Sequence, residues 1–237
     1  MIILVPSYKR AGSVITRKWL CHSVLCVHES EAEAYQLLEM GKIAIMPDAL
    51  KGNMSKVRNW MLDYGFERDN HVIMMDDDVT AVGYHEKGKQ VKVDEDGFME
   101  FLERGYGVAE ELDVKLWGVN VQSDPMFYMQ WAPVSLNVPV LGTLSCHIKH
   151  PLRYDERLSL NEDYDMFLQH CLQYRKVLRF DKWHYYAKHM DLAGGCAAYR
   201  NLTEEKIQAD IMQKKWGKEV VRYNFKKSCN PILRVPF

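Results

Sequence analysis

The chain has 237 residues, of which 47% are hydrophobic and 27% are charged, and its formal net charge is −1. This profile is typical of a globular protein with one large hydrophobic core, so we expect a single domain. No apolar stretch is long enough to span a bilayer, and the start, MIILVPSYKR, lacks the charged lead-in of a signal peptide. A membrane protein is therefore not expected, and the cytoplasm is the expected location.

The first third of the chain alternates short apolar runs with amphipathic stretches, the pattern of βαβ units and a parallel sheet. The apolar runs predict strands at residues 2–5, 23–27, 42–46 and 71–75. In such sheets, ligands gather at the carboxyl ends of the strands, where helix N-termini also point. Functional residues are therefore expected directly after these runs.

Two helices are predicted between these strands. The first follows the second strand, because Ser30 and Glu33 have the spacing of a capping box and Gly41 supplies a C-terminal stop. The second is expected to run from about residue 54 to residue 64, with Gly65 as its stop.

The later part of the chain predicts a mixed sheet, because strand-like stretches follow one another without intervening helices. Residues 83–97 are polar and contain glycine, as in a hairpin or a mobile loop. The remaining expected elements are a helix around 98–112, strands at 115–121, 133–142 and 143–149, a helix at 161–174, strands at 177–180 and 183–189, a helix near 203–217 and a less regular basic tail.

The cysteines and the C-terminal charge each have an ordinary interpretation. The six cysteines form no CxxC pair and no close Cys/His cluster of zinc-ligand spacing, so we expect reduced, mostly buried thiols. Segment 171–237 carries fourteen Lys and Arg against six Asp and Glu, an excess of 14 − 6 = +8. Such an excess fits either a phosphate backbone or a solvated helix face with a loose tail.

Three adjacent aspartates follow the fourth predicted strand, in the stretch VIMMDDDV. Adjacent carboxylates repel one another, so in a dry place they need a cation or hydrogen-bond donors. Mg²⁺ or Mn²⁺ takes oxygen ligands and often only one or two protein carboxylates. Asp76 and Asp78 can point the same way at a strand end, while Asp77 points to the other side. The residues alone fit a cation site or a solvated turn.

Three further stretches have both a functional and an ordinary interpretation. PSYKR, after the first strand, suits an edge where a base stacks while Lys9 or Arg10 meets phosphate, but it also fits a plain turn. In LNEDYD, Glu162 and Asp163 stand in the first turn of a helix, as a general base or as ordinary N-terminal acids. His184 or His189 of WHYYAKHMDLAGG could be a metal ligand or a structural histidine.

In this order the four features resemble the GT-A fold of nucleotide-sugar-dependent glycosyltransferases, over residues 1–200. MMDDDV looks like the DxD motif and NED like the acceptor-side acidic motif. More narrowly, VPSYKR, KVRN, IMMDDDV, LNEDYD and the late KKWGK resemble the TET-associated glycosyltransferases of bacteriophages. Those proteins are implicated in adding sugars to hydroxymethylated cytosines in phage DNA.

The resemblance implies an α/β fold of GT-A type, with a Rossmann-like mixed central sheet flanked by helices in a single domain. Its nucleotide-sugar half would cover about residues 1–80 and its acceptor half about 81–200. Residues 201–237 would form a basic helix and tail packed on the domain. A phage-encoded chain would act in the host cytoplasm.

The resemblance also assigns roles by position. The donor, expected to be a UDP-sugar, would lie among residues from the first two strand ends, the second helix and the triplet: Pro6, Ser7, Tyr8, Arg10, Glu29, Arg58, Asp76 and Asp77. Asp78 would hold Mn²⁺ or Mg²⁺ against the diphosphate, with Asp76 as a shared ligand, His189 completing the metal shell and His184 as its competitor. Whether Asp77 shares in ligation is open. The second strand lacks the Asp with which many members hold uracil.

Asp163 resembles the catalytic base of inverting members and would take a proton from the acceptor hydroxyl. The implied acceptor is 5-hydroxymethylcytosine in double-stranded DNA, which requires base flipping or an opened groove. The basic C-terminal third would then grip phosphates, and Trp183, Tyr185 or Trp216 could support an extruded base. A saccharide or protein acceptor, or a nucleotide-binding or DNA-binding module without turnover, is the alternative.

Overall fold

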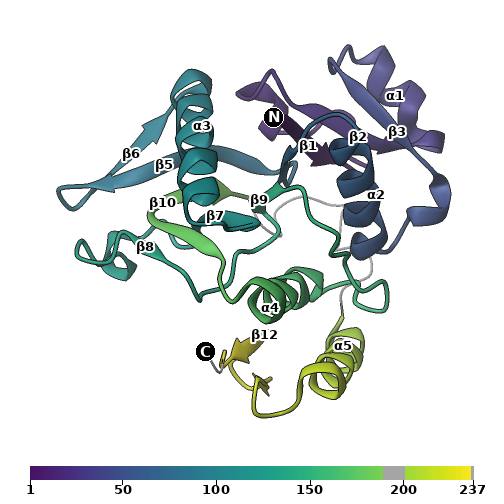
Figure 1. The fold of residues 1–237 in the computed structure, drawn as a ribbon. Helices are drawn as coiled ribbons and strands as arrows, with labels where there is room; N and C mark the ends of the chain where they lie inside the picture. Colours follow the sequence, from purple (N-terminus) through teal and green to yellow (C-terminus); the bar gives the residue numbers. More distant parts are fainter. Residues whose placement is uncertain (189–200, 236–237) are drawn as a thin grey trace.

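A computed structural model describes residues 1–188 and 201–235 of the chain (Figure 1). Its centre is a mixed sheet in which neighbouring strands follow the order β3-β2-β1-β4-β9-β7-β10-β5-β6, with β8 paired to β10. The strands are β1 Ile2–Pro6, β2 Val24–His28, β3 Ile43–Met46, β4 His71–Met75, β5 Val79–Glu86, β6 Lys89–Val93, β7 Leu116–Asn120, β8 Val134–Ser135, β9 Leu144–Ile148 and β10 Leu178–Ala187. β3 and β6 lie on opposite sides of the view in Figure 1.

The pairing changes direction at β9. Strands β1 to β4 pair parallel in the order β3-β2-β1-β4, and β9 then pairs antiparallel with both β4 and β7. β10 pairs parallel with β7 and antiparallel with β5. The parallel first third and the mixed remainder are as the sequence predicts, and the expected mixed sheet flanked by helices in a single domain is confirmed.

The five α-helices of the described residues are α1 Ala32–Leu37, α2 Met54–Phe66, α3 Glu95–Glu111, α4 Glu162–Tyr174 and α5 Leu202–Trp216. Helices α1 and α3 pack on one face of the sheet, whereas α2 and α4 pack on the other. Each strand therefore contributes side chains to two cores, as Ile3 and Leu4 of β1 do. No described helix has the length and apolar character needed to cross a membrane.

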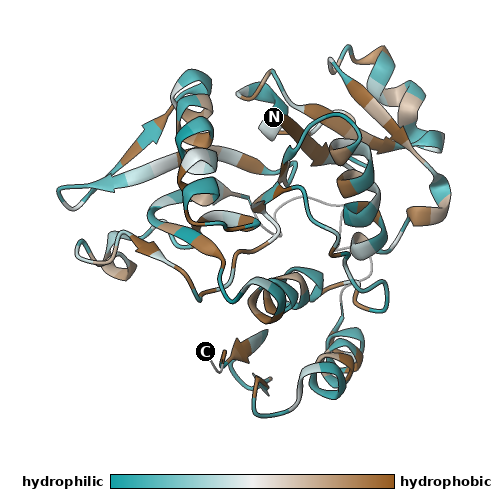
Figure 2. Ribbon diagram, in the orientation of Figure 1, coloured by the Kyte–Doolittle hydropathy of each residue, from teal (hydrophilic) through white to brown (hydrophobic). Residues whose placement is uncertain are grey.

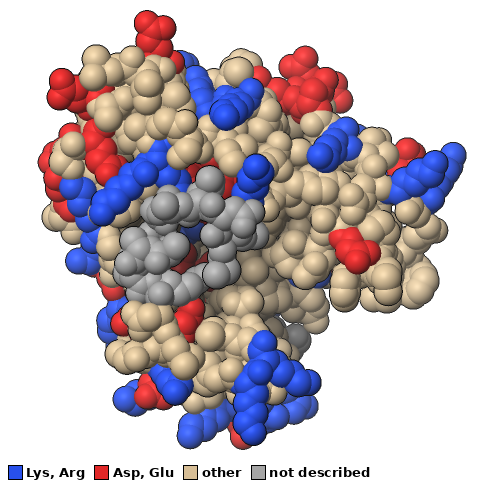
Figure 3. Space-filling model, turned by 180° about the vertical axis from the view of Figure 1, so that it is seen from behind, with Lys and Arg blue, Asp and Glu red and all other residues tan. Residues whose placement is uncertain are grey.

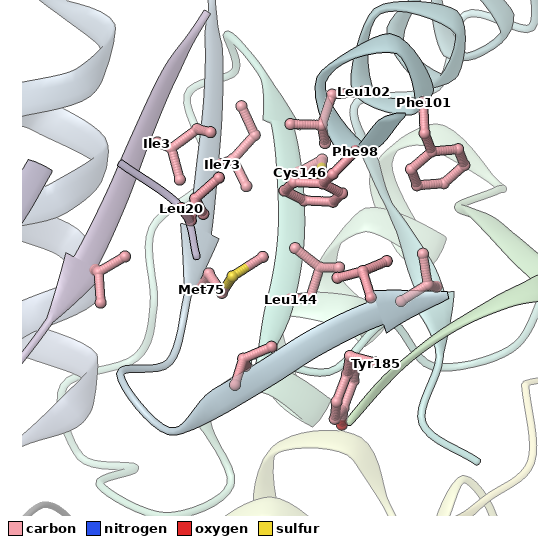
Figure 4. Close-up of a cluster of buried hydrophobic side chains, with 14 of the residues drawn as sticks. Ile3, Leu20, Ile73, Met75, Phe98, Phe101, Leu102, Leu144, Cys146 and Tyr185 are labelled. Carbon is pink, nitrogen blue, oxygen red and sulfur yellow. The ribbon is translucent and has the colours of Figure 1, made fainter. Parts of the chain in front are cut away.

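The core under α3 is rich in aromatic side chains. Phe98 and Leu102 of α3 lie over Cys146 of β9 (Figure 4), and Phe101 of the same helix stacks on Trp183 of β10. Gly105 lets the helix approach Trp117 of β7, because a Cβ there would lie 2.3 Å from the indole ring. Figure 2 shows the apolar residues concentrated in the central strands and the polar residues on the outer helix faces. This packing fixes the strands whose ends carry the site.

Several sequence-based boundaries are wrong for local reasons. Ser30 does not cap α1, because residues 29–31 form a 3₁₀ turn in which Lys51 donates a hydrogen bond to the Ser30 hydroxyl. Gly65 does not stop α2, since the helix continues to Phe66 and Gly65 is packed against Val72. Of residues 133–142, only Val134 and Ser135 form a strand.

Two other regions are more regular than the sequence suggests. Residues 177–189 were expected as two strands, but Leu178–Ala187 forms one long strand with shifts in its pairing register. The tail forms a hairpin, with β11 at Val221–Asn224 and β12 at Ser228–Leu233. Trp216 anchors this region, since its Nε1 donates to Asp165 of α4 at 2.7 Å.

Candidate active site

One cavity of about 590 Å³ lies at the carboxyl ends of β1 and β4. Its wall includes the ends of the first two strands, helix α2, the aspartate triplet, the start of α4 and the C-terminal hairpin, which are far apart in the sequence. The residues that line it are Pro6, Ser7, Tyr8, Arg10, His28, Met46, Met54, Val57, Arg58, Asp76, Asp77, Asp78, Val121, Gln122, Leu141, Thr143, Leu160, Glu162, Asp163, Tyr164, Tyr185 and Asn230. The edge predicted to bind ligands is therefore hollow.

The triplet forms the turn between β4 and β5, and its middle member is held by the protein. The Ser7 hydroxyl donates to Asp77 Oδ2 at 2.7 Å, and Arg10 pairs with Oδ1. Tyr35 in turn donates to Ser7 at 2.9 Å. Burial raises the pKa of Asp77, against the lowering effect of Ser7 and Arg10. Asp77 thus connects the aspartate turn to the loop after β1. The sequence left the role of Asp77 open, and the structure shows that Ser7 and Arg10 hold its side chain.

The outer two aspartates differ from Asp77 in their surroundings. Asp76 is the more accessible, with 29% of its side chain exposed, and Asp78 is buried. The backbone of Asp76 donates to Thr143 and that of Asp78 accepts from Lys188, which fixes both on the cavity wall. Two carboxylates on one wall are the hard oxygen donors that Mg²⁺ and Mn²⁺ prefer, so these residues fit the expected cation.

Arg58 joins the two acidic motifs. Its Nη2 donates to Asp76 Oδ1 at 3.3 Å, and its Nε donates to Glu162 Oε1 at 3.1 Å. The side chain is almost fully buried, and Gly142 leaves space for its guanidinium. An uncompensated charge in such a place would be costly, so Arg58 requires both carboxylates.

Asp163 stands half-buried in the first turn of α4. Its Oδ2 accepts a hydrogen bond from the Gly142 backbone at 3.1 Å, and its Oδ1 accepts one from the Tyr164 backbone at 2.8 Å. Burial raises the pKa of Asp163 despite these donors and the nearby Arg58. A positioned carboxylate with a raised pKa has the character of a general base. Glu162 is less suited, because Arg58 already engages it.

The expected nucleotide-binding residues divide into two groups. Pro6, Ser7, Tyr8, Arg10 and Arg58 line the cavity together with all three aspartates and Asp163. Glu29 is exposed and is not among the lining residues; its buried neighbour His28 lines the wall instead. The His28 ring meets Tyr8 edge to face at 5.5 Å, an aromatic contact that sequence spacing could not reveal.

The two candidate histidines have different outcomes. His189 lies outside the described residues. His184 is buried on β10, where it contacts His85 at a centroid distance of 4.3 Å, whereas its neighbour Tyr185 lines the cavity. Adjacent strand residues face opposite sides of a sheet, so His184 points away from the cavity and its proposal as a metal ligand is not supported.

Of the three aromatic residues considered for an extruded base, only Tyr185 is in the cavity. Trp183 stacks on Phe101 in the core at 3.9 Å, and Trp216 bonds Asp165. Sequence reasoning also missed Thr143 and Asn230, which line the wall. No motif marks them, because tertiary packing alone brings them there.

Two solved structures are distantly similar: A197 from STIV, with 9% identity, a TM-score of 0.43 and coverage of 78% of this chain and 84% of that one; and CMP:2-keto-3-deoxy-manno-octonic acid synthetase complexed with CTP, with 10% identity, a TM-score of 0.39 and coverage of 90% and 98%. Likeness at this level carries no functional conclusion. A search of curated proteins finds no significant match.

The fold and the cavity together define the class: an α/β protein whose central mixed sheet carries, at one edge, a cavity lined by charged side chains. Residues 1–195 match the model of the TET-Associated Glycosyltransferase family. The chain belongs to this family and is a glycosyltransferase associated with TET-linked DNA modification. This membership argues against the alternative of a nucleotide-binding or DNA-binding module that catalyses no reaction.

Proposed function

We propose that the protein transfers a sugar from a nucleotide-sugar, with UDP as the expected nucleotide, to the hydroxyl of 5-hydroxymethylcytosine in DNA. The observation that carries this proposal is the meeting of Asp76, Asp78 and Asp163 in one cavity. These residues come from two distant motifs, and a sugar transfer needs both a site for the diphosphate and a base for the acceptor.

The donor would occupy the side of the cavity formed by the first loop and the triplet. Tyr8 and His28 offer ring surfaces beside the nucleotide, and Arg10 carries positive charge there. Asp76 and Asp78 would hold Mn²⁺ or Mg²⁺, which when bound would neutralise the leaving diphosphate. Arg58 holds Asp76 in place through its hydrogen bond.

Asp163 would act on the acceptor side. The acceptor hydroxyl gives its proton to the Asp163 carboxylate as its oxygen bonds to the anomeric carbon of the sugar. The bond from that carbon to the diphosphate oxygen breaks, and the configuration inverts. The Gly142 and Tyr164 N–H groups hold the carboxylate for this role.

The C-terminal hairpin supports a DNA acceptor. Asn230 of β12 lines the cavity, and the turn before β12 carries the exposed Lys226 and Lys227. Figure 3, which shows the molecule from behind, has Lys and Arg side chains gathered at the bottom, where α5 and the hairpin lie. Positive charge beside the cavity suits a phosphate backbone. A stacked base cannot enter a deep cavity, so the target base would be extruded.

The direct test is to incubate the protein with Mn²⁺, a panel of sugar nucleotides and either plain or hydroxymethylated DNA, then digest the DNA and weigh its nucleosides. The expected result is a hexose-sized mass gain on hydroxymethylcytosine only. Donor turnover with a saccharide or protein acceptor and no gain in DNA would overturn the DNA assignment. Release of pyrophosphate would instead indicate nucleotidyl transfer.

A further inference from the structure

A second group of convergent side chains lies away from the cavity. His147 of β9, His150 just after it and His170 of α4 are all buried, and each offers one ring nitrogen such that these atoms lie within 4.8 Å of one another. None of the three lines the active-site cavity. The spacing of these histidines does not mark a zinc site in the sequence, because His170 lies twenty residues beyond His150.

Hydrogen bonds orient two of the rings. His170 Nδ1 lies 2.9 Å from the Met166 carbonyl, so this nitrogen carries the proton and donates it. His170 Nε2 is then a lone-pair nitrogen, and within the described residues it has no hydrogen-bond partner. His147 Nε2 lies 3.3 Å from the Ser145 hydroxyl, which leaves its Nδ1 facing His150. Outer hydrogen bonds of this kind are typical of metal-binding histidines.

The distance between the His147 and His150 nitrogens suits a metal ion. His147 Nδ1 and His150 Nε2 are 3.0 Å apart, close to the roughly 3.3 Å between nitrogens that each lie about 2.0–2.1 Å from a tetrahedral zinc. Without a metal, one of these two nitrogens must carry a proton and donate it to the other. His170 Nε2 would then remain a buried acceptor without a hydrogen bond, which costs folding free energy.

We propose that His147, His150 and His170 bind a divalent transition metal, with Zn²⁺ as the expected ion, in a structural site distinct from the carboxylate site of the cavity. Three imidazole nitrogens suit zinc rather than Mg²⁺ or Mn²⁺, which prefer oxygen. Water would supply the fourth position. Helix α4 carries both His170 and, at its start, Asp163, so the metal would fix the helix that positions the base.

The test begins with the metal content of the full chain, purified without a histidine tag, dialysed against a weak chelator and analysed by mass spectrometry of the elements. About one zinc per chain is expected. His150→Gln and His170→Gln should each weaken zinc binding by at least the roughly 10- to 100-fold that loss of an outer-shell partner causes. His184→Gln removes a buried histidine outside the cluster and should retain the zinc, as should Asp78→Asn.

X-ray absorption of the zinc-loaded wild-type protein keeps the proposal testable if the cluster variants do not fold. Imidazole nitrogens in the first shell are expected, together with a tetrahedral absorption spectrum after cobalt substitution. A folded wild-type chain that binds neither zinc nor cobalt would overturn the proposal. So would a first shell dominated by carboxylate oxygens, or zinc retained by both cluster variants.

Discussion

Arg58 of α2 and Asp76 of the aspartate turn are joined by a 3.3 Å hydrogen bond inside the cavity wall. The same guanidinium reaches Glu162 of α4, so one buried cation connects the two acidic motifs of the site. These motifs are more than eighty residues apart in the sequence. Arg58 therefore helps to hold the two acidic motifs next to each other, and substituting it tests whether this contact matters for the fold of the site.

Arg58→Ala should destabilise the protein strongly. Removing one partner of a buried ion pair leaves its carboxylates uncompensated, at a cost of about 3–5 kcal/mol. Urea unfolding measures this change. Arg68→Ala is the matched control, because Arg68 and its partner Glu67 are largely exposed and such a pair contributes below about 1 kcal/mol. Equal effects from the two variants would contradict the described network.

Glu162 should make stability depend on pH. Burial, and then the neighbouring Asp163, raise the pKa of Glu162 above its usual 4.5, while Arg58 lowers it. Folding therefore favours the protonated acid, so its contribution is full below pH 4.5 and is lost as pH rises through the raised pKa. The free energy of unfolding of the wild type, relative to Glu162→Gln, should fall over this window. A flat or rising difference would show that the pKa is not raised.

Asp163→Asn should stop transfer without stopping donor binding. General base catalysis contributes roughly 10²–10⁴-fold, and the amide keeps an oxygen for the Gly142 N–H but cannot take a proton. The rate of nucleoside diphosphate release with acceptor present measures this loss. Asp210→Asn changes an exposed acid on α5 and should leave the rate unaltered. A nearly normal rate in Asp163→Asn would assign the base elsewhere.

The basic hairpin should contribute to DNA affinity in a salt-dependent way. Each phosphate contact adds about 0.9 to the slope of log K against log salt concentration, so Lys226→Gln with Lys227→Gln should reduce the slope by about 2. Fluorescence anisotropy of labelled duplex measures it. Lys18→Gln with Lys42→Gln removes two other exposed charges as the control. An identical reduction in the control pair would show that net charge, not the hairpin, is responsible.

The sequence predicts the strands and the cavity residues where local patterns are strong. Apolar runs predicted β1 to β4, and the charged residues after these runs predicted that Arg10, Asp76 and Asp78 lie at one edge. Those predictions succeed because parallel strands bring their carboxyl ends together. Gly65 shows the opposite case: tertiary contact with Val72 overrides its usual role as a stop.

Other parts of the site depend on contacts that no local pattern encodes. Asn230 reaches the cavity only because the tail folds as a hairpin, and His170 meets His147 only because α4 packs on β9. The strand alternation predicts that Asp77 points away from Asp76 and Asp78, but not that Ser7 and Arg10 hold it. Long-range packing supplies these relationships.

The central claim is that one cavity holds the donor, its cation and the catalytic base. Its most direct measurement is the binding of UDP by titration calorimetry, with and without Mn²⁺, to the wild type, Asp78→Ala and Asp163→Asn. We predict that Asp78→Ala loses the Mn²⁺-dependent part of the affinity, while Asp163→Asn keeps it. Unchanged Mn²⁺-dependent binding in Asp78→Ala would contradict the account.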